Sequence, residues 1–317
     1  MTIGLGIFCF ISGYLISYNN PEFLSFEDIK KFYKKRIIRI YPLYWLAIVS
    51  LIVFLFVSVN ILNLQNLSIE LNTMMTPFTI LISFFGLQIL LNPSSVFWYV
   101  GFIVLCYALY PLIKKLTKSD VQILLVSLLM IGLFGLLRIF FNLIDDRFFI
   151  FFLLFIGGVI VNNEKILENT FSKNKELLLV ILSCILVFIF LVDKLYLKNI
   201  IPLNLSIIIG YILLNLLIIF FCIFCINLLR KKALNEIITR FGYIIVFIAT
   251  GSYSVYLFHE MILELGHILS IMVGLTPVAN ELFILFLIVP IIFVICYYIQ
   301  IFGVRMTERI IKRYRGI

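Results

Sequence analysis

The stretch GSYSVYLFHEMILELGH, Gly251–His267, combines membrane-like hydrophobicity with ionisable side chains. It holds both histidines of the chain, two glutamates and a row of hydroxyl groups, whereas the other long apolar runs are nearly free of ionisable groups. Such groups are costly in lipid, so they usually face a bundle interior, a cavity or a substrate path. We therefore interpret this stretch as a functional membrane helix.

Two polar stripes would share that helix. They contain, in order, Ser252, Tyr256 and His259, and then Glu260, Glu264 and His267. Residues at such spacings lie on one helix face. A histidine can act as a general base near neutral pH, and a carboxylate beside it can orient it, which makes His259 and Glu260 candidate catalytic residues. The alternative is that these groups only form hydrogen bonds between helices of a bundle.

The composition predicts an all-α, polytopic transmembrane helix bundle. Of 317 residues, 63% are hydrophobic and 13% are charged, against about 45–50% and about 25% in soluble domains. The apolar runs are long enough to cross a bilayer. The net charge of +9 comes from basic residues between these runs, which the positive-inside rule explains without a nucleic-acid partner. We see no soluble domain and expect residues 1–317 to form one transmembrane domain.

Nine apolar runs are expected to be full spans. They are residues 2–18, 41–59, 96–113, 121–139, 148–161, 177–192, 203–229, the helix that contains Gly251–His267, and residues 282–304. A further run, Pro77–Leu91, is short for a span. The architecture is therefore about nine full spans plus one re-entrant or short apolar segment, with ten spans as the alternative.

Loop charges favour the count of nine. We place the basic segment Pro21–Arg39, read as a polar loop, in the cytoplasm. If Pro77–Leu91 crossed fully, the basic loops after Ile113 and Leu229 and the basic tail Arg305–Ile317 would all lie outside; if it does not cross, all three lie inside. The positive-inside rule favours the second arrangement. It puts the C-terminus in the cytoplasm and the N-terminal end of the Gly251–His267 helix on the cytoplasmic side.

The first basic cluster reads KKRIIRIYP and contains Arg36 and Arg39. Their spacing of three places both on one helix face. Two guanidinium groups there could clamp a phosphate through bidentate hydrogen bonds. The alternative is anchoring against anionic lipid headgroups. The aromatic residues that follow, like those at Phe97–Tyr99, are typical of an interfacial belt.

The cysteine pattern does not indicate a metal site. Cys222 and Cys225 form a C-x-x-C pair inside an apolar run, without a histidine or a second pair nearby. Cysteines in such runs usually act as small buried hydrophobic residues. We therefore expect no bound metal.

Four segments carry a resemblance to a known family. They are GIFCFISGYLI at Gly6–Ile16, RIIRIYP at Arg36–Pro42, WYVGFIVLCYALYP at Trp98–Pro111, and SYSVYLFH at Ser252–His259. In this order they resemble the S-G-[FY]-L-I, R-x-x-R-[IL]-x-P, W-[FY]-L and S-Y-S-x-Y-L-x-H motifs of the acyltransferase-3 family of integral-membrane acyltransferases. The resemblance covers essentially the whole chain.

The resemblance implies transfer of an acyl group, usually acetyl, from cytoplasmic acyl-CoA to a hydroxyl of a cell-surface or lipid-linked glycan. It implies no bound cofactor, membrane lipid as surroundings, and a location in a bacterial cytoplasmic membrane. The family's R-x-x-R pair suggests that Arg36 and Arg39 hold the acyl-CoA. The remaining motif residues are Ser12, Gly13, Trp98, Tyr107, Ser252, Tyr253 and Tyr256.

Family members begin with a further helix that carries an arginine and a histidine regarded as catalytic. This chain starts at what resembles the second helix, so we expect an N-terminally incomplete domain in which His259 and Glu260 are supporting groups. Two alternatives remain: a non-catalytic truncated member, or a polysaccharide export or flippase component. A transporter would be expected to show inverted repeats and broken helices, and the sequence shows no clear repeat.

Overall fold

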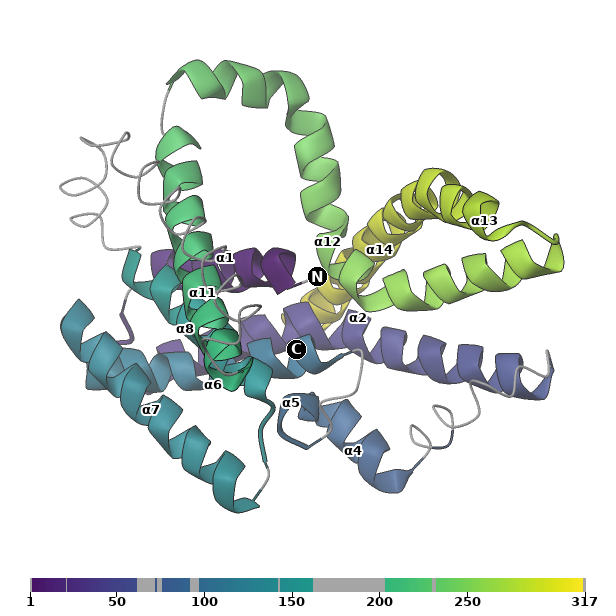
Figure 1. Ribbon diagram of the computed structural model, residues 1–317. Coiled ribbons are helices and arrows are strands. Elements are labelled where there is room, and N and C mark those ends of the chain that lie inside the picture. Colours follow the sequence, from purple (N-terminus) through teal and green to yellow (C-terminus); the bar gives the residue numbers. More distant parts are fainter. Residues whose placement is uncertain are drawn as a thin grey trace. The chain divides into compact units, whose positions relative to one another are not determined.

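The computed structural model describes residues 2–20, 22–61, 72, 76–91, 97–141, 143–161, 203–229 and 232–315. All regular structure in these residues is helical (Figure 1), which confirms the predicted all-α class for this part of the chain. The elements are α1 Thr2–Asn19, α2 Phe26–Asn60, α4 Pro77–Phe85, α5 Gln88–Leu91, α6 Trp98–Leu116, α7 Asp120–Phe141, α8 Asp146–Val161, α11 Leu203–Leu229, α12 Lys232–Met272, α13 Pro277–Phe283, the π-helix η3 Ile284–Ile288, and α14 Val289–Arg315.

Six helices in the described part are long and apolar enough to cross a bilayer. They are Phe26–Asn60, Trp98–Leu116, Asp120–Phe141, Ile209–Ile226, Gly242–Met272 and Pro277–Arg309. Helix α1 is apolar but shorter. The expected span at residues 177–192 lies outside the described residues, so the total of nine spans stays a prediction.

The chain divides into two compact units, each made of three separated stretches. The first unit comprises Met1–Ile29, Ile89–Pro93 and Gly101–Glu236. The second unit comprises Lys30–Gln88, Ser94–Val100 and Ile237–Ile317. Each unit therefore brings together segments that are far apart in the sequence.

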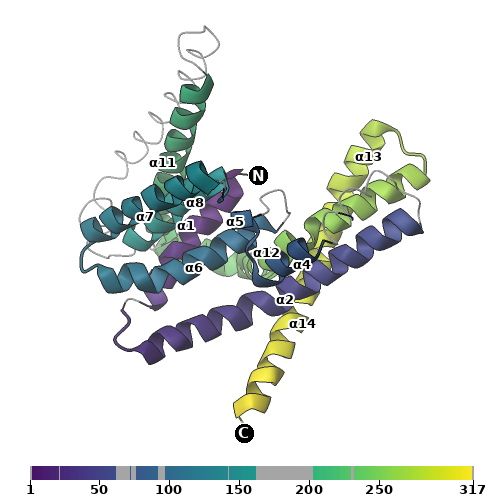
Figure 2. The same ribbon diagram turned by 90° about the horizontal axis from the view of Figure 1, so that it is seen from below.

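In the first unit, α1 and α8 lie side by side (Figure 2) and touch through glycines. A Cβ atom added to Gly13 would overlap the carbonyl oxygen of Phe155, and one added to Gly158 would overlap that of Phe10. Small residues let membrane helices approach this closely, because their packing relies on van der Waals contact rather than on the hydrophobic effect. Gly13 is therefore a packing residue.

The rest of this unit's core is aromatic. Phe148 stacks on Phe152 with ring centroids 5.0 Å apart and meets Phe102 edge-on at 6.0 Å. Helix α11 joins through Asn215, whose Nδ2 donates to the carbonyl of Ile150 at 3.1 Å. Such an amide bond between helices is typical of membrane interiors.

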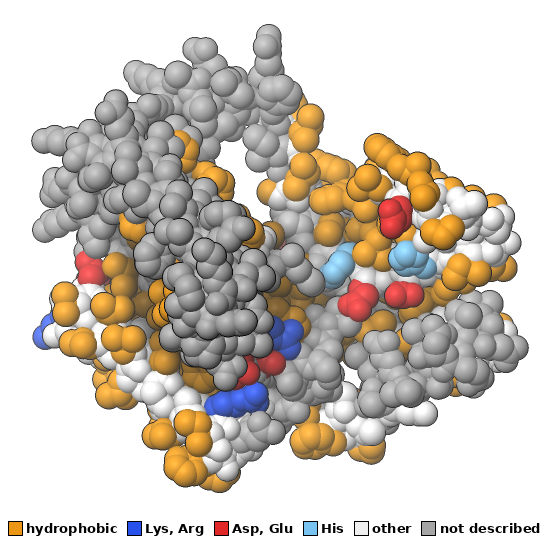
Figure 3. All heavy atoms as spheres, in the orientation of Figure 1, with side chains coloured by type: hydrophobic (Ala, Val, Ile, Leu, Met, Phe, Trp, Pro, Cys, Tyr) orange, Lys and Arg blue, Asp and Glu red, His pale blue; other side chains and the backbone are white. Residues whose placement is uncertain are grey.

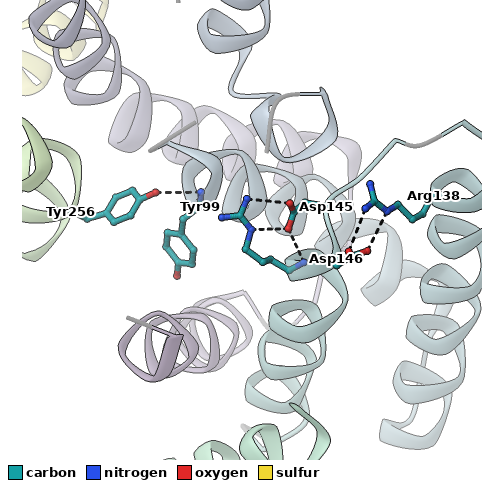
Figure 4. Close-up of polar contacts among 6 residues, drawn as sticks. Tyr99, Arg138, Asp145, Asp146 and Tyr256 are labelled. Atoms are coloured by element: carbon teal, nitrogen blue, oxygen red, sulfur yellow. Dashed lines mark hydrogen bonds and ion pairs between the residues drawn. The ribbon is translucent and has the colours of Figure 1, made fainter. Parts of the chain in front are cut away.

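The turn between α7 and α8 holds the backbone of α5. Ile144 has a φ of 73°, which is unusual for a β-branched residue. Its N–H donates to the carbonyl of Leu90, and that of Asp145 donates to the carbonyl of Ile89, both at 3.0 Å. Arg147 donates to the carboxylate of Asp145, the residue labelled in Figure 4, from Nε at 2.7 Å and from Nη2 at 3.1 Å.

The basic segment expected as a loop is helical instead, because α2 begins at Phe26. Ser25 and Asp28 form a reciprocal cap: the Asp28 N–H donates to Ser25 Oγ at 3.2 Å, and the Ser25 N–H donates to Asp28 Oδ2 at 3.0 Å. Such a cap starts a helix, and lysine and arginine continue it readily. Arg36 and Arg39 therefore lie on the same continuous helix as the apolar span.

In the second unit, α4 ends against α2. Three side chains of α2 donate to the last carbonyls of α4: Tyr44 to Ser83 at 2.5 Å, Trp45 to Phe84 at 3.0 Å, and Tyr41 to Phe85 at 2.9 Å. These carbonyls have no partner inside their own helix. The tyrosines and the tryptophan expected as an interfacial belt thus cap a helix.

A glycine turn separates α4 from α5. Gly86 is left-handed, with a φ of 68°, and its N–H donates to the Ser83 carbonyl at 3.1 Å while that of Leu87 donates to Ile82 at 2.9 Å. This is the Schellman ending. Helix α4 has nine residues and is about 14 Å long, well short of a bilayer core of about 30 Å.

Helix α14 packs on α12 and α2 through two further glycines. Gly251 faces the backbone of Tyr297, and a Cβ on Gly303 would lie 2.6 Å from Leu43 Cδ2. At the first crossing, the buried Ser254 hydroxyl donates to Gln300 Oε1 at 2.7 Å. The π-helix η3 and Pro290 both interrupt this last apolar segment.

Candidate functional site

Two of the four motif segments contact each other directly. The hydroxyl of Tyr253, on α12, donates to the carbonyl of Ile40, on α2, at 3.0 Å. Pro42 lies inside α2, where a proline removes one backbone donor and loosens the preceding turn. The carbonyl that receives Tyr253 belongs to that turn. The residue after Arg39 is thereby joined to the S-Y-S segment.

A third segment joins through Tyr256. Its hydroxyl accepts the backbone N–H of Tyr99 at 3.3 Å (Figure 4). That N–H belongs to the first turn of α6, where backbone donors have no partner within the helix. The two tyrosine rings also meet edge-on, with centroids 5.4 Å apart. Trp98, one residue earlier, is buried.

His259 is held by the backbone of its own helix. Its Nδ1 lies 2.8 Å from the carbonyl oxygen of Tyr256 and 3.1 Å from that of Val255. Because a carbonyl only accepts, Nδ1 carries the proton, and the neutral ring keeps its lone pair on Nε2. These carbonyls therefore orient the ring, in place of the neighbouring carboxylate expected from the sequence.

His267 has the opposite tautomer. Asn280 Nδ2, a donor, lies 3.3 Å from His267 Nδ1, so Nδ1 accepts and Nε2 carries the proton. Figure 3 shows both histidines, in pale blue, with acidic side chains nearby on the same face. At Nε2, His259 can therefore accept a hydrogen bond, and His267 can donate one.

Glu260 lines a small pocket within the second unit. The other lining residues are Ala47 and Leu51 of α2, Phe97 just before α6, and Leu257, Phe258 and Met261 of α12. At 3.6 residues per turn, the α12 residues that line the pocket share one side of the helix, and His259 lies on the other. His259 and Glu260 therefore serve different faces of α12.

Arg36 lies one turn before Ile40, which accepts the Tyr253 hydrogen bond, and Arg39 directly precedes it. Arg36 is half-buried, and its guanidinium carbon is 5.4 Å from the ring centroid of Phe32, a cation–π distance. Arg39 is exposed. Their membrane side stays a prediction.

The predicted site residues divide between the units. Those in the second unit are Arg36, Arg39, Trp98, Ser252, Tyr253, Tyr256, His259 and Glu260. Ser252 Oγ donates to the carbonyl of Ala249, on its own helix, at 2.9 Å. In the first unit, Ser12 Oγ lies 2.8 Å from the Tyr107 hydroxyl, and Gly13 packs against α8.

Sequence reasoning missed the polar group around Tyr44. Gln88 Nε2 donates to the Tyr44 hydroxyl, and both side chains are fully buried. The signal that could have revealed it is the spacing of Tyr41, Tyr44 and Trp45, which places three polar aromatic side chains on one helix face. That signal is shared with ordinary interfacial anchors.

Comparison with protein families supplies a match over nearly the whole chain. The family model for the acyltransferase domain of the acyltransferase-3 type matches residues 1–301. The comparison with curated proteins gave no match, and neither did the comparison with solved structures. The matched range contains all four motif segments and both units' candidate residues.

Proposed function

The chain belongs to the acyltransferase-3 family, and from this premise we propose that it transfers an acyl group, acetyl in the simplest case, from acyl-CoA to a hydroxyl of a cell-surface or lipid-linked glycan. The observation that supports this most is the Tyr253–Ile40 hydrogen bond, which joins the R-x-x-R helix to the helix of His259 and Glu260. A cationic donor site and proton-accepting groups thereby belong to one packed unit.

The donor would be held at the basic end of α2. Arg36 and Arg39 lie one turn apart, and guanidinium groups bind phosphate oxygens through paired hydrogen bonds. The continuous helix gives these cations a fixed position relative to Ile40, because α2 runs unbroken from Phe26 to Asn60. Arg36 is further positioned by its contact with the Phe32 ring.

In the transfer step, the acceptor hydroxyl oxygen attacks the thioester carbonyl. The new C–O ester bond forms, the C–S bond breaks, and the sulfur leaves as the CoA thiolate. We assign the hydroxyl proton to one of two groups on different faces of α12, His259 or Glu260, which later returns it to the thiolate and releases CoA–SH. His259 offers the Nε2 lone pair, and Glu260 offers a carboxylate at a pocket; both are suitable general bases.

The test uses a strain that lacks the chain and is complemented by variants. Wild type should restore ester-linked acetyl on the isolated surface glycan, and Arg36→Ala with Arg39→Ala should not. Lys30→Ala, which removes a cation from the same helix, is the matched control and should behave as wild type. Normal acetylation by the double arginine variant would refute the donor assignment.

Export of polysaccharide is the second candidate. The break between α4 and α5 is of the kind that transporters place beside a substrate. The same strains separate the two functions, because acetyl content and the amount of exported polymer are measured independently. Loss of acetyl with normal polymer supports transfer, and loss of polymer supports export.

A further inference from the structure

We propose that the pocket between α2, Phe97 and α12 receives the alkyl end of the transferred acyl group and limits it to a methyl. This inference rests on the proposed acyl transfer. It makes Leu51 and Met261 the residues that set acyl chain length. The pocket lies wholly within the second unit, and all its lining residues are described.

The lining has the chemistry of an alkyl site. Ala47, Leu51, Phe97, Leu257 and Phe258 are all buried. Of the seven lining side chains, only Glu260 is polar. An alkyl group is stabilised by apolar walls, while a single carboxylate at the site suits a reaction that must accept a proton.

The size of the pocket restricts what can enter. Its volume is about 10 Å³, which is close to the space that one water-sized group requires. A methyl group is the smallest alkyl end that an acyl donor can present. A longer chain would have to displace Leu51 or Met261, and overfilling a packed site is costly.

The position of the pocket also suits a CoA thioester. Ala47 and Leu51 follow Arg39 by eight and twelve residues on α2, a rise of about 12–18 Å along the helix. The phosphates of CoA are separated from its sulfur by the extended pantetheine arm. One helix would therefore hold the phosphates at its basic end and the acyl group further along.

The wild-type protein should strongly prefer acetyl-CoA over donors with longer acyl chains. One methylene too many in an apolar pocket typically changes the specificity ratio by about 10–200-fold. Wild type should therefore use acetyl-CoA over propionyl-CoA by at least about 10-fold. Butyryl-CoA should be used less than propionyl-CoA.

The experiment enlarges the pocket and measures acyl transfer to isolated glycan with acetyl-, propionyl- and butyryl-CoA. Leu51→Ala and Met261→Ala should each reduce the acetyl-over-propionyl ratio by about 10-fold or more. Leu55→Ala is the control: Leu55 is buried one turn further along α2 and does not line the pocket. It should leave the ratio at the wild-type value even if the protein is less stable, because a ratio does not depend on how much enzyme is folded.

The outcomes separate this inference from the proposed function. If wild type transfers no acyl group from any of the three donors, the proposed function fails. If wild type transfers acetyl but Met261→Ala and Leu51→Ala keep its chain-length ratio, the pocket assignment is overturned. A wild type that uses butyryl-CoA as well as acetyl-CoA overturns it too.

Discussion

The α1–α8 contact of the first unit and the contacts of α2 with α4 and α12 in the second unit are of different kinds. In the first unit, α1 and α8 touch through Gly13 and Gly158, and phenylalanine rings fill the remaining space. In the second unit, tyrosine and tryptophan side chains donate to helix carbonyls, where α4 ends against α2 and where α12 crosses it. The closest α1–α8 contacts, at the two glycines, involve no polar side chain, whereas α2 is joined to α4 and α12 by hydrogen bonds from polar side chains.

The four motif segments therefore contain two kinds of residue: some are needed for close packing of helices, and others carry polar groups. Gly13 is a motif residue because α8 leaves no room for a side chain. Tyr253 and Tyr256 are motif residues because their hydroxyls join α12 to α2 and α6. Substitutions at the α1–α8 contact should therefore remove folded protein, and those at the polar contacts of α2 and α12 should change activity or local order.

Gly13→Ala should have the largest effect. The added Cβ would overlap the Phe155 carbonyl, and because backbone must move to admit it, we expect a loss of about 3 kcal/mol or more of unfolding free energy. Thermal unfolding in detergent measures this. Gly132→Ala, on α7 with open space around the added atom, should be neutral or slightly stabilising. Equal effects of the two substitutions would show that α1 and α8 do not touch as described.

The double substitution His259→Gln with Glu260→Gln should reduce acyl transfer by about 10²–10⁴-fold, the usual contribution of general base catalysis. Its unfolding temperature should stay near that of wild type, since both side chains lie at least partly exposed. The single variants then tell which residue takes the proton. Glu264→Gln, one turn further on an exposed position, is the control. Full activity of the double variant would contradict the assignment.

Tyr44→Phe should destabilise the second unit by about 2 kcal/mol. It removes one of two donors from the Ser83 carbonyl, which keeps the Gly86 N–H, and leaves the Gln88 amide without its buried partner; an unsatisfied buried group costs about 1–3 kcal/mol. Hydrogen exchange of α4 is the measurement, with Tyr18→Phe, an exposed side chain, for comparison. Unchanged protection of α4 would show that Tyr44 does not cap it.

Tyr256→Phe should have the smallest effect, about 1 kcal/mol, because it removes one hydrogen bond to the Tyr99 N–H and keeps the ring contact. Faster exchange of the Tyr99 amide would confirm the bond. Tyr256→Leu, which also removes the ring, should cost more. Equal stability of the two variants would mean that the edge-on ring contact contributes nothing.

Hydropathy and the spacing of polar groups predicted the helical class of the described part of the chain. They also predicted that Arg36 and Arg39 share a helix face, because a period of 3.6 residues is local information. The loop expected at Pro21–Arg39 was wrong, since the cap formed by Ser25 and Asp28 starts α2 early. Hydropathy shows where an apolar span gives way to charged residues, but the helix itself can extend into the charged segment, as α2 does.

Contacts between distant residues could not be predicted in the same way. Nothing local to Tyr41, Tyr44 and Trp45 distinguishes an interfacial anchor from a cap on α4, because both need a polar atom on an aromatic ring. The orientation of His259 depends on which backbone carbonyls its ring reaches. The role of Gly13 depends on α8, a helix far along the sequence.

The continuity of α2 has a mechanical consequence. Arg36 and Arg39 occupy one turn, and the aromatic residues that hold the end of α4 occupy the next, on a helix without a break between them. Pro42 lies between the two turns and loosens the one before it. An anion that turned or tilted the arginine end of α2 would therefore act through this turn on the hydrogen bonds to the carbonyls of Ser83, Phe84 and Phe85.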